Sequence, residues 1–281
     1  MKTGLKTRGF TIVEIIIVMT VTAILLVSAL TLFSGKQSAV QFNQAANDLQ
    51  SQVNQIISNV QTGYYNRPAN FTCTKSGSMP AIASGGSQDL GTNADCIFLG
   101  RAIQFFVSGT NDNGFDVYNL LGLHYDPGTS NAVSTLANAS PIALAPGTVT
   151  NGGFPTDFTE TDNLLYGLQA VSMQYNGSAA TKSGIVAIVS NINGNPAAGG
   201  SSTASLYVVN NGNTNTDQTA AQAAEEIDKP NAANFTAVDS VTVCFDGGTS
   251  LYAILTIGSN NRQLTTTLNM LNKNPTPAVC T

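Results

Sequence analysis

Glu14 is the residue whose type and position most need a chemical explanation. It is the one ionisable side chain in the 24 residues from Phe10 to Phe33, which are otherwise mostly apolar. A carboxylate in such a span is disfavoured in hydrocarbon, and by default it marks a functional site. We therefore expect another group to use the charge of Glu14.

The cysteines are the next candidates for chemistry, and the sequence has four: Cys73, Cys96, Cys244 and Cys280. None lies in a CxxC pair and the sequence has one histidine, so a zinc site is not expected. An even number of cysteines in a translocated chain favours disulfides. Of the three possible pairings we favour Cys73–Cys96 with Cys244–Cys280, because each closes a local loop. The alternative is four reduced core cysteines.

Catalytic patterns are missing from the sequence. It has no GxSxG, P-loop, HExxH or dinucleotide-binding motif. His124 precedes a Pro-Gly turn and is expected to be an ordinary loop histidine. The loop 110–116 faintly resembles a calcium loop through Asp112, Asn113 and Asp116, but it lacks the later bidentate glutamate, so a solvated turn is favoured. We expect neither an enzyme nor a cofactor or metal.

The low content of charged residues limits the kinds of partner that we expect. Charged residues make up 10% of the chain, against roughly 25% in an ordinary soluble protein. Such a polar but uncharged surface suits a protein that works outside the cell or packs against copies of itself. Without the first nine residues, eight cations face sixteen acids. Strong nucleic-acid binding is therefore not expected, and a weak role of an assembly in DNA uptake stays open.

Three interpretations compete for residues 1–35. A cleaved secretory signal has an apolar region of about 7–15 residues, and the run here is far longer. A plain membrane anchor fits the length, because about 20 apolar residues span a bilayer. The cations Lys2, Lys6 and Arg8 would keep the amino end in the cytoplasm. A plain anchor, however, gives no reason for Glu14.

The third interpretation rests on the stretch "KTRGFTIVE", residues 6–14. It resembles the class III signal of type IV pilins and pseudopilins. That signal is a short basic leader ending in glycine, followed by phenylalanine and by a glutamate at the fifth position of the mature chain. Gly9, Phe10 and Glu14 match these positions, and a long apolar run follows them.

The resemblance implies a processing pathway and a set of partners. A prepilin peptidase would remove the leader 1–9 by cutting after Gly9, and would methylate the new amino terminus at Phe10. Glu14 would then meet the charged amino terminus of a neighbouring subunit, because a charge pair in low dielectric offsets part of its own desolvation. The implied partners are the peptidase, other pilin or pseudopilin subunits, an assembly platform in the inner membrane and the lipid bilayer.

The element that must position Glu14 is expected to be a helix over 10–62. An isolated strand in lipid would leave its backbone unpaired, so helix is favoured over 10–33 despite many β-branched residues. This part is expected to span the membrane and later to form the filament core. Over 34–62 apolar residues recur at spacings of three and four, which predicts an amphipathic continuation that ends at Gly63. The alternative is an anchor followed by an unrelated coiled-coil stalk.

Residues 63–281 are expected to form a globular, β-rich head. Strand-like runs alternate there with polar, glycine-rich loops, and the last 44 residues are expected to be consecutive antiparallel strands. A helix is expected at 217–228. The predicted strands cover 96–107, 165–175, 184–191, 204–210, 238–245, 251–258 and 262–271.

These features predict an α+β fold in which a long amino-terminal helix packs on an antiparallel β-sheet domain. The resemblance implies a single-pass membrane protein with a cytoplasmic amino terminus and an extracytoplasmic head, which forms a cell-surface filament when assembled. We expect a structural subunit of a type IV pilus-like filament, in a minor or specialised position because of its length. Two alternatives stay open: a pseudopilin of a type II secretion system, and a membrane-anchored surface adhesin or hydrolase.

Overall fold

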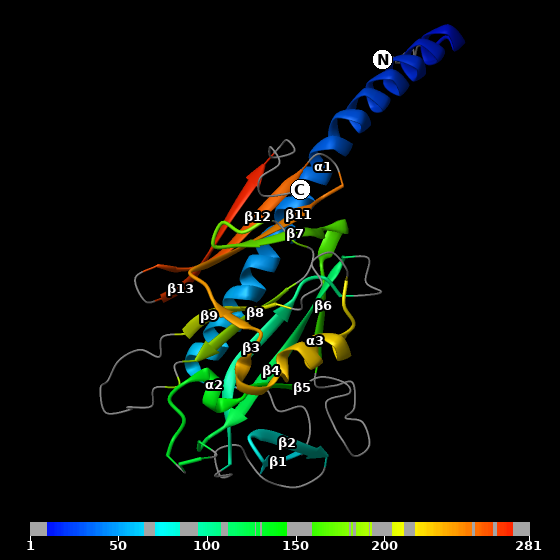
Figure 1. The fold of residues 1–281 in the computed structure, drawn as a ribbon. Coiled ribbons are helices and arrows are strands. Elements are labelled where there is room, and N and C mark those ends of the chain that lie inside the picture. Colours follow the sequence, from blue (N-terminus) through cyan, green and yellow to red (C-terminus); the bar gives the residue numbers. More distant parts are fainter. Residues whose placement is uncertain are drawn as a thin grey trace, which may run out of the picture.

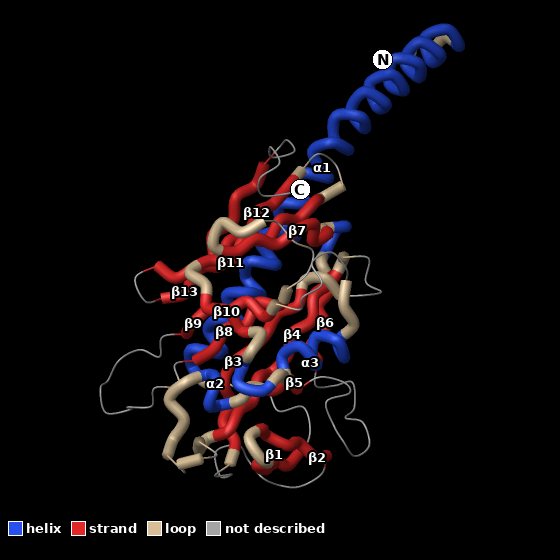
Figure 2. Tube along the Cα trace, in the orientation of Figure 1, coloured by secondary structure: helices blue, strands red, loops and turns tan. Residues whose placement is uncertain are grey.

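The fold is α+β and consists of one long helix and antiparallel sheets, as expected (Figure 2). It is seen in a computed structural model. The structure describes residues 10–64, 71–84, 95–107, 112–126, 128–129, 131–144, 159–179, 181, 184–190, 192, 204–210, 217–248, 251–260 and 263–271.

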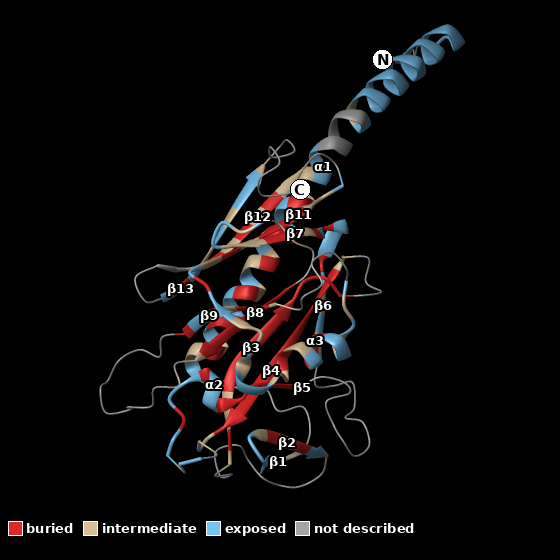
Figure 3. Ribbon diagram, in the orientation of Figure 1, coloured by how far each residue is buried: buried red, intermediate tan, exposed pale blue. Residues whose placement is uncertain are grey.

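Helix α1 spans Ile12–Thr62 and forms the axis of the molecule (Figure 1). It ends where predicted, because Gly63 adopts the left-handed conformation (φ 68°) that glycine tolerates without a steric cost. The first half projects alone, and no part of Ile12–Leu30 is buried, whereas the second half enters the head (Figure 3).

The second half of α1 is amphipathic. Phe42, Leu49, Val53, Ile56 and Val60 are almost completely buried, and their spacing places them on one side of the helix. The opposite side carries exposed Asn, Gln and Ser side chains. The helix therefore has one face for the head domain and one face for solvent or another molecule.

The larger sheet lies against one side of α1. Its strand order is β10-β9-β8-β3-β4-β5, and β6 also pairs with β4. Helices α2 and α3 pack on the face opposite α1, together with a second buried cluster around Tyr118. The bounds are β3 Cys96–Gln104, β4 Gly114–Leu123, α2 Leu136–Ala139, β5 Ile142–Leu144, β6 Thr159–Asn163, β8 Ile185–Ser190, β9 Ala204–Val209, α3 Ala220–Ile227 and β10 Phe235–Ala237.

The smaller sheet has the order β13-β12-β11-β7. Its last three strands follow one another as antiparallel hairpins, as predicted for the carboxy-terminal part. A separate hairpin, β1 with β2, lies at the far end of the head (Figure 1). The bounds are β1 Phe71–Ser76, β2 Met79–Ser84, β7 Gln169–Tyr175, β11 Ser240–Asp246, β12 Tyr252–Asn260 and β13 Gln263–Leu271, with short 3-10 helices at Leu165–Gly167 and Pro230–Ala232.

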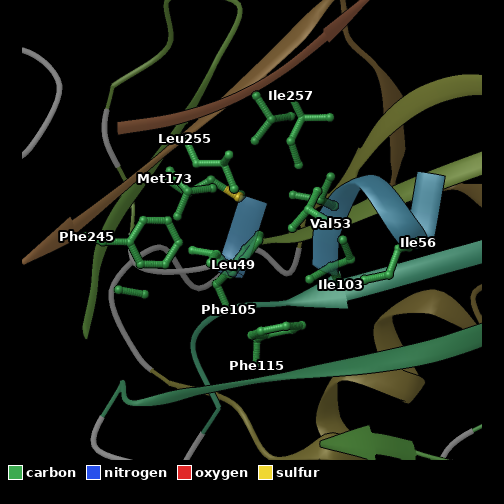
Figure 4. Close-up of a cluster of buried hydrophobic side chains, with 14 of the residues drawn as sticks. Leu49, Val53, Ile56, Ile103, Phe105, Phe115, Met173, Phe245, Leu255 and Ile257 are labelled. Atoms are coloured by element: carbon green, nitrogen blue, oxygen red, sulfur yellow. The ribbon is translucent and has the colours of Figure 1, made fainter. Parts of the chain in front are cut away.

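The main core lies where α1 meets both sheets. Leu49 and Val53 of α1 pack in one buried cluster with Ile103 of the larger sheet and with Leu255 and Ile257 of the smaller one (Figure 4). Both sheets thus contribute to the core that buries this one face of the helix. The helix is an integral part of the head's core and not a stalk attached to it.

Strand β4 was not among the predicted strands, although it is central to the larger sheet. Every residue from Gly114 to Leu123 is buried, so the strand has no alternation of apolar and polar residues to reveal it. Asp116 and Asn119 interrupt the apolar run further. The sequence pattern of this strand therefore looks like a loop.

Candidate assembly site

The exposed half of α1 is the first component of the candidate site. Residues Ile12–Leu30 form a helix that is long and apolar enough to cross a membrane, and none of this span is buried inside the described structure. Exposed apolar area of this extent marks a contact with lipid or with another chain.

The hydroxyl groups in this span are satisfied within the helix. Thr20 donates to the carbonyl oxygens of Ile16 and Ile17, at 3.0 and 2.9 Å. Thr22 and Ser28 donate in the same way, each 2.8 Å from a carbonyl one turn earlier. Such internal bonds remove the main penalty of placing hydroxyls in hydrocarbon, so Glu14 remains the only group of the span that needs an external explanation.

Glu14 lies in the first turn of α1. Thr11 is the N-cap residue, and its side-chain oxygen accepts a hydrogen bond from the Glu14 backbone N–H, at 3.3 Å. The spacing Thr-x-x-Glu is that of a capping box, a local signal present in the sequence. Within the described residues, no donor or cation is bonded to the Glu14 carboxylate.

The position near the helix start gives Glu14 a local benefit, but a small one. A carboxylate near a helix amino terminus contributes about 0.3–1 kcal/mol. Insertion scales give roughly 2.5–3.5 kcal/mol for Asp, Lys or Arg at the centre of a spanning helix, and the cost is smaller at the end of the span, where Glu14 lies. We expect a partner outside this helix to offset the part that capping leaves.

Phe10 and Glu14 line the same shallow depression of about 270 Å³, together with Ile15, Val18 and Met19. The Phe10 side chain is 78% exposed, and Gly9 lies outside the described residues. A neighbouring chain could contact both Phe10 and Glu14 at this surface. Their roles in methylation and in subunit assembly stay predictions.

The first predicted disulfide is present in the structure. Cys73 and Cys96 are bonded, with their Cα atoms 6.1 Å apart. The bond attaches hairpin β1–β2 to β3 of the larger sheet, inside a small buried cluster with Ile82 and Leu121. The disulfide and the packing of Ile82 in this cluster together attach the hairpin to the sheet.

Cys244 is also disulfide-bonded. On β11 the neighbouring residues Val243 and Phe245 face the α1 core, so the alternation of a strand places Cys244 on the opposite face of the smaller sheet. Cys280 lies outside the described residues, and the pairing Cys244–Cys280 stays a prediction.

The faint calcium loop and the histidine have ordinary surroundings. Asp116 belongs to β4, where its carboxylate accepts a hydrogen bond from Thr161 at 2.7 Å. The carbonyl oxygen of Asp112 accepts a hydrogen bond from Ala170 N–H at 2.9 Å. The described part of the chain contains no group of three acidic, histidine or cysteine residues that could hold a metal. The His124 ring lies against that of Tyr125, 4.2 Å between centroids.

One polar pocket was not foreseen. It has a volume of about 340 Å³, and its lining includes Gln52 and Asn59 of α1, Arg101 of β3, and Glu160 and Asp162 of β6. We call it the Arg101 pocket. The pocket joins three segments that are distant in the sequence, with Arg101 and Glu160 59 positions apart, so no local pattern could have revealed it.

The comparison with known proteins agrees with the geometry of the amino-terminal segment. Residues 5–30 match the family model of the prokaryotic N-terminal methylation motif, which is the prepilin signature of type IV pilins and pseudopilins. No curated protein and no solved structure matches the chain significantly. The chain therefore carries a pilin-type signal and is pilin-like or pseudopilin-like. The motif implies processing by prepilin peptidase and assembly with other pilin subunits.

Proposed function

We propose that this chain is a structural subunit of a type IV pilus-like filament, in a minor or specialised position. It is made as a precursor whose leader is cut after Gly9 and whose new amino terminus, at Phe10, is methylated. Before assembly, the subunit is anchored in the inner membrane with its head outside the cytoplasm. It then joins the filament through the exposed half of α1.

The observation that carries this proposal is the combination of the methylation motif with an exposed apolar helix. The motif covers residues 5–30, and Ile12–Leu30 has no buried part. Lipid can cover this surface before assembly and other helices can cover it afterwards. The Glu14 carboxylate, which has no bonded partner within the described part of the chain, then gains one when a second subunit arrives.

Each segment of the chain has its own role in this proposal. The leader, residues 1–9, is recognised by the peptidase. Residues 10–33 form the membrane anchor before assembly and the filament core after it. Residues 34–62 join this core to the head through the contacts of α1 with both sheets. The head, 63–281, is the part that the filament displays.

The direct test is mass spectrometry of the mature amino terminus, with the protein purified from the membranes of its own host. We expect a chain that begins with a methylated Phe10. A chain that retains Met1 would contradict the proposal and would leave a plainly anchored adhesin or hydrolase as the explanation.

A second experiment separates a pilus from a secretion pseudopilus, whose subunits have the same type of amino-terminal segment. We expect deletion of the gene to change surface filaments and to leave the secretion of exoproteins intact. Loss of exoprotein secretion with normal surface filaments would assign the chain to a type II secretion system.

A further inference from the structure

The Arg101 pocket carries more negative than positive charge. Among the described residues, Arg101 is the one cation in its lining, and its side chain is only 3% exposed. Its two terminal nitrogens donate to the two carboxylate oxygens of Glu160, at 3.0 and 3.3 Å. This bidentate pair neutralises Glu160 and leaves Arg101 little charge to offer elsewhere.

Asp162 is the carboxylate that remains uncompensated. It lines the pocket beside Glu160, and no hydrogen bond or ion pair to its side chain is seen within the described part of the chain. Partial burial, followed by the charges of Glu160 and Asp48, raises the pKa of Asp162 above its ordinary value. A cation brought into the pocket would remove this destabilisation.

The rest of the lining suits a long basic side chain. Gln52 and Asn59 supply polar atoms, while Ile56 and Tyr64 supply apolar surface for the methylene stem of a lysine or arginine. The pocket opens at the surface, because the Glu160 side chain is 38% exposed. A basic side chain therefore fits both the charge and the shape.

Among the described residues there are four cations, and three of them have partners. Arg101 binds Glu160, Lys229 forms an ion pair with Glu226 at 3.0 Å, and Lys75 has an interaction within the head. Lys36 is exposed on α1, and no ion pair of Lys36 is seen within the described part of the chain.

Lys36 cannot reach the Arg101 pocket of its own chain. It precedes Gln52 and Asn59 on the same helix by 16 and 23 residues, which at 1.5 Å per residue is about 24–35 Å. A second copy displaced by that distance along the helix axis would, however, bring its Lys36 to this pocket. Such an axial displacement is what assembly through α1 would produce.

We propose that the Arg101 pocket receives Lys36 from a second copy of this chain, displaced by about 24–35 Å along the α1 axis. The ammonium group lies between Asp162 and Glu160, and the stem lies on Ile56. This inference rests on the proposed function, because it requires subunits that assemble side by side through α1. It assigns a second contact, in the head, to a neighbour other than the one whose amino terminus meets Glu14.

Charge reversal tests the pairing in the host cell. We expect Lys36→Glu and Asp162→Lys each to lower the amount of sheared filament about tenfold, because each places like charges at the contact. The double variant should restore most of the loss. The control Gln263→Glu, which adds an acidic side chain at an exposed position of β13 outside the pocket, should leave filament yield unchanged.

Cysteine cross-linking tests the same contact without reversing a charge and covers the case that Asp162→Lys fails to fold. A lysine that reaches into the pocket holds the two Cα atoms farther apart than the roughly 7 Å that a direct disulfide spans, so the pair Lys36→Cys with Asp162→Cys is joined by a short bis-maleimide, which cannot bridge these positions within one chain. Treatment of filaments or membranes with this reagent should give a ladder of cross-linked chains with the pair. It should give none with either single variant or with Lys75→Cys combined with Asp162→Cys.

The outcomes separate the inference from the proposed function. Wild-type filament yield in both single reversals, or no ladder in cells that assemble filaments, would overturn the Lys36 contact and leave the function standing. A chain without a methylated Phe10 and without filaments would overturn both.

Discussion

The side chain of Gln50 on α1 donates a hydrogen bond to the backbone carbonyl of Thr266 on β13, at 3.3 Å, and lies 3.2 Å from the Thr266 hydroxyl. That hydroxyl in turn donates to Asn54 of α1 at 2.8 Å. Strand β13 is an edge of its sheet within the described residues, and edge strands expose backbone groups that otherwise invite pairing with other chains. The helix thus satisfies part of this edge with its own amides.

Gln50→Ala should loosen this edge. We expect a loss of about 1 kcal/mol in the free energy of unfolding, because it removes hydrogen bonds that are partly shielded from water. Urea denaturation of the full chain in detergent measures it. The control is Gln44→Ala, an exposed position of α1 without a bond to β13. Equal effects of the two changes would show that the contact contributes nothing.

Replacing Glu14 separates its charge from its capping role. Glu14→Gln keeps the Thr-x-x-Gln form of the capping box but has no charge to meet an amino terminus. We expect normal cleavage after Gly9 with a loss of filaments of tenfold or more, on the order of the value of a buried charge pair. Immunoblots of the cell and sheared fractions measure both steps. Glu14→Ala should behave in the same way, whereas normal filaments from Glu14→Gln would show that the charge has no assembly role.

Removing the disulfide between Cys73 and Cys96 should release hairpin β1–β2. The residues are separated by 23 positions, and closing a loop of this size stabilises a protein by about 3 kcal/mol. We expect the variant with both cysteines replaced by serine to be cleaved by protease within 71–84 while the sheet around β3 persists. Limited proteolysis followed by mass spectrometry maps the sites. Ser76→Ala, on the same hairpin, is the control and should stay resistant.

Asp228 should make the stability of the head depend on pH. It follows α3, and its Oδ1 accepts a hydrogen bond from Ala143 N–H on β5, at 2.8 Å. Burial raises the pKa of Asp228 to about 7, and the Ala143 bond opposes this only in part. Because the folded state binds the proton more tightly, its contribution is fully present below pH 4 and is lost as the pH rises through 7.

Asp228→Asn should remove this dependence, because the amide keeps the acceptor oxygen and never ionises. We expect the variant to match the wild-type chain near pH 4 and to exceed it at pH 8, by an amount on the order of a few kcal/mol. Thermal melts of the full chain from pH 4 to 8 measure the difference. A wild-type melting temperature that does not fall from pH 5 to pH 8 relative to the variant would contradict the assignment.

The sequence predicted those elements whose pattern is local. Helix α1 and its end at Gly63, the β11–β12–β13 hairpins and the helix at Ala220–Ile227 follow from periodicity and turn residues. Strand β4 was missed because burial on both faces removes alternation. That the β domain divides into two sheets that both pack on α1 was also not visible, since it depends on contacts between distant segments.

The residues of the candidate site were likewise predictable only where they lie close together in the sequence. Gly9, Phe10 and Glu14 are adjacent in sequence, so a short motif was enough to single them out. Arg101 and Glu160 are separated by 59 positions, and their pairing appears only when β6 is placed beside β4. No pattern in a single sequence reports such a contact.

The packing of α1 against both sheets has a mechanical consequence. In the proposed filament, tension would pull each subunit along its helix axis while the head resists. The buried side chains from Phe42 to Val60 contact both sheets. A pull along the helix axis would therefore load all of these contacts simultaneously in shear and would not break them one after another. The head would then slip only if many contacts broke at once, which is the arrangement expected of a part that must carry force.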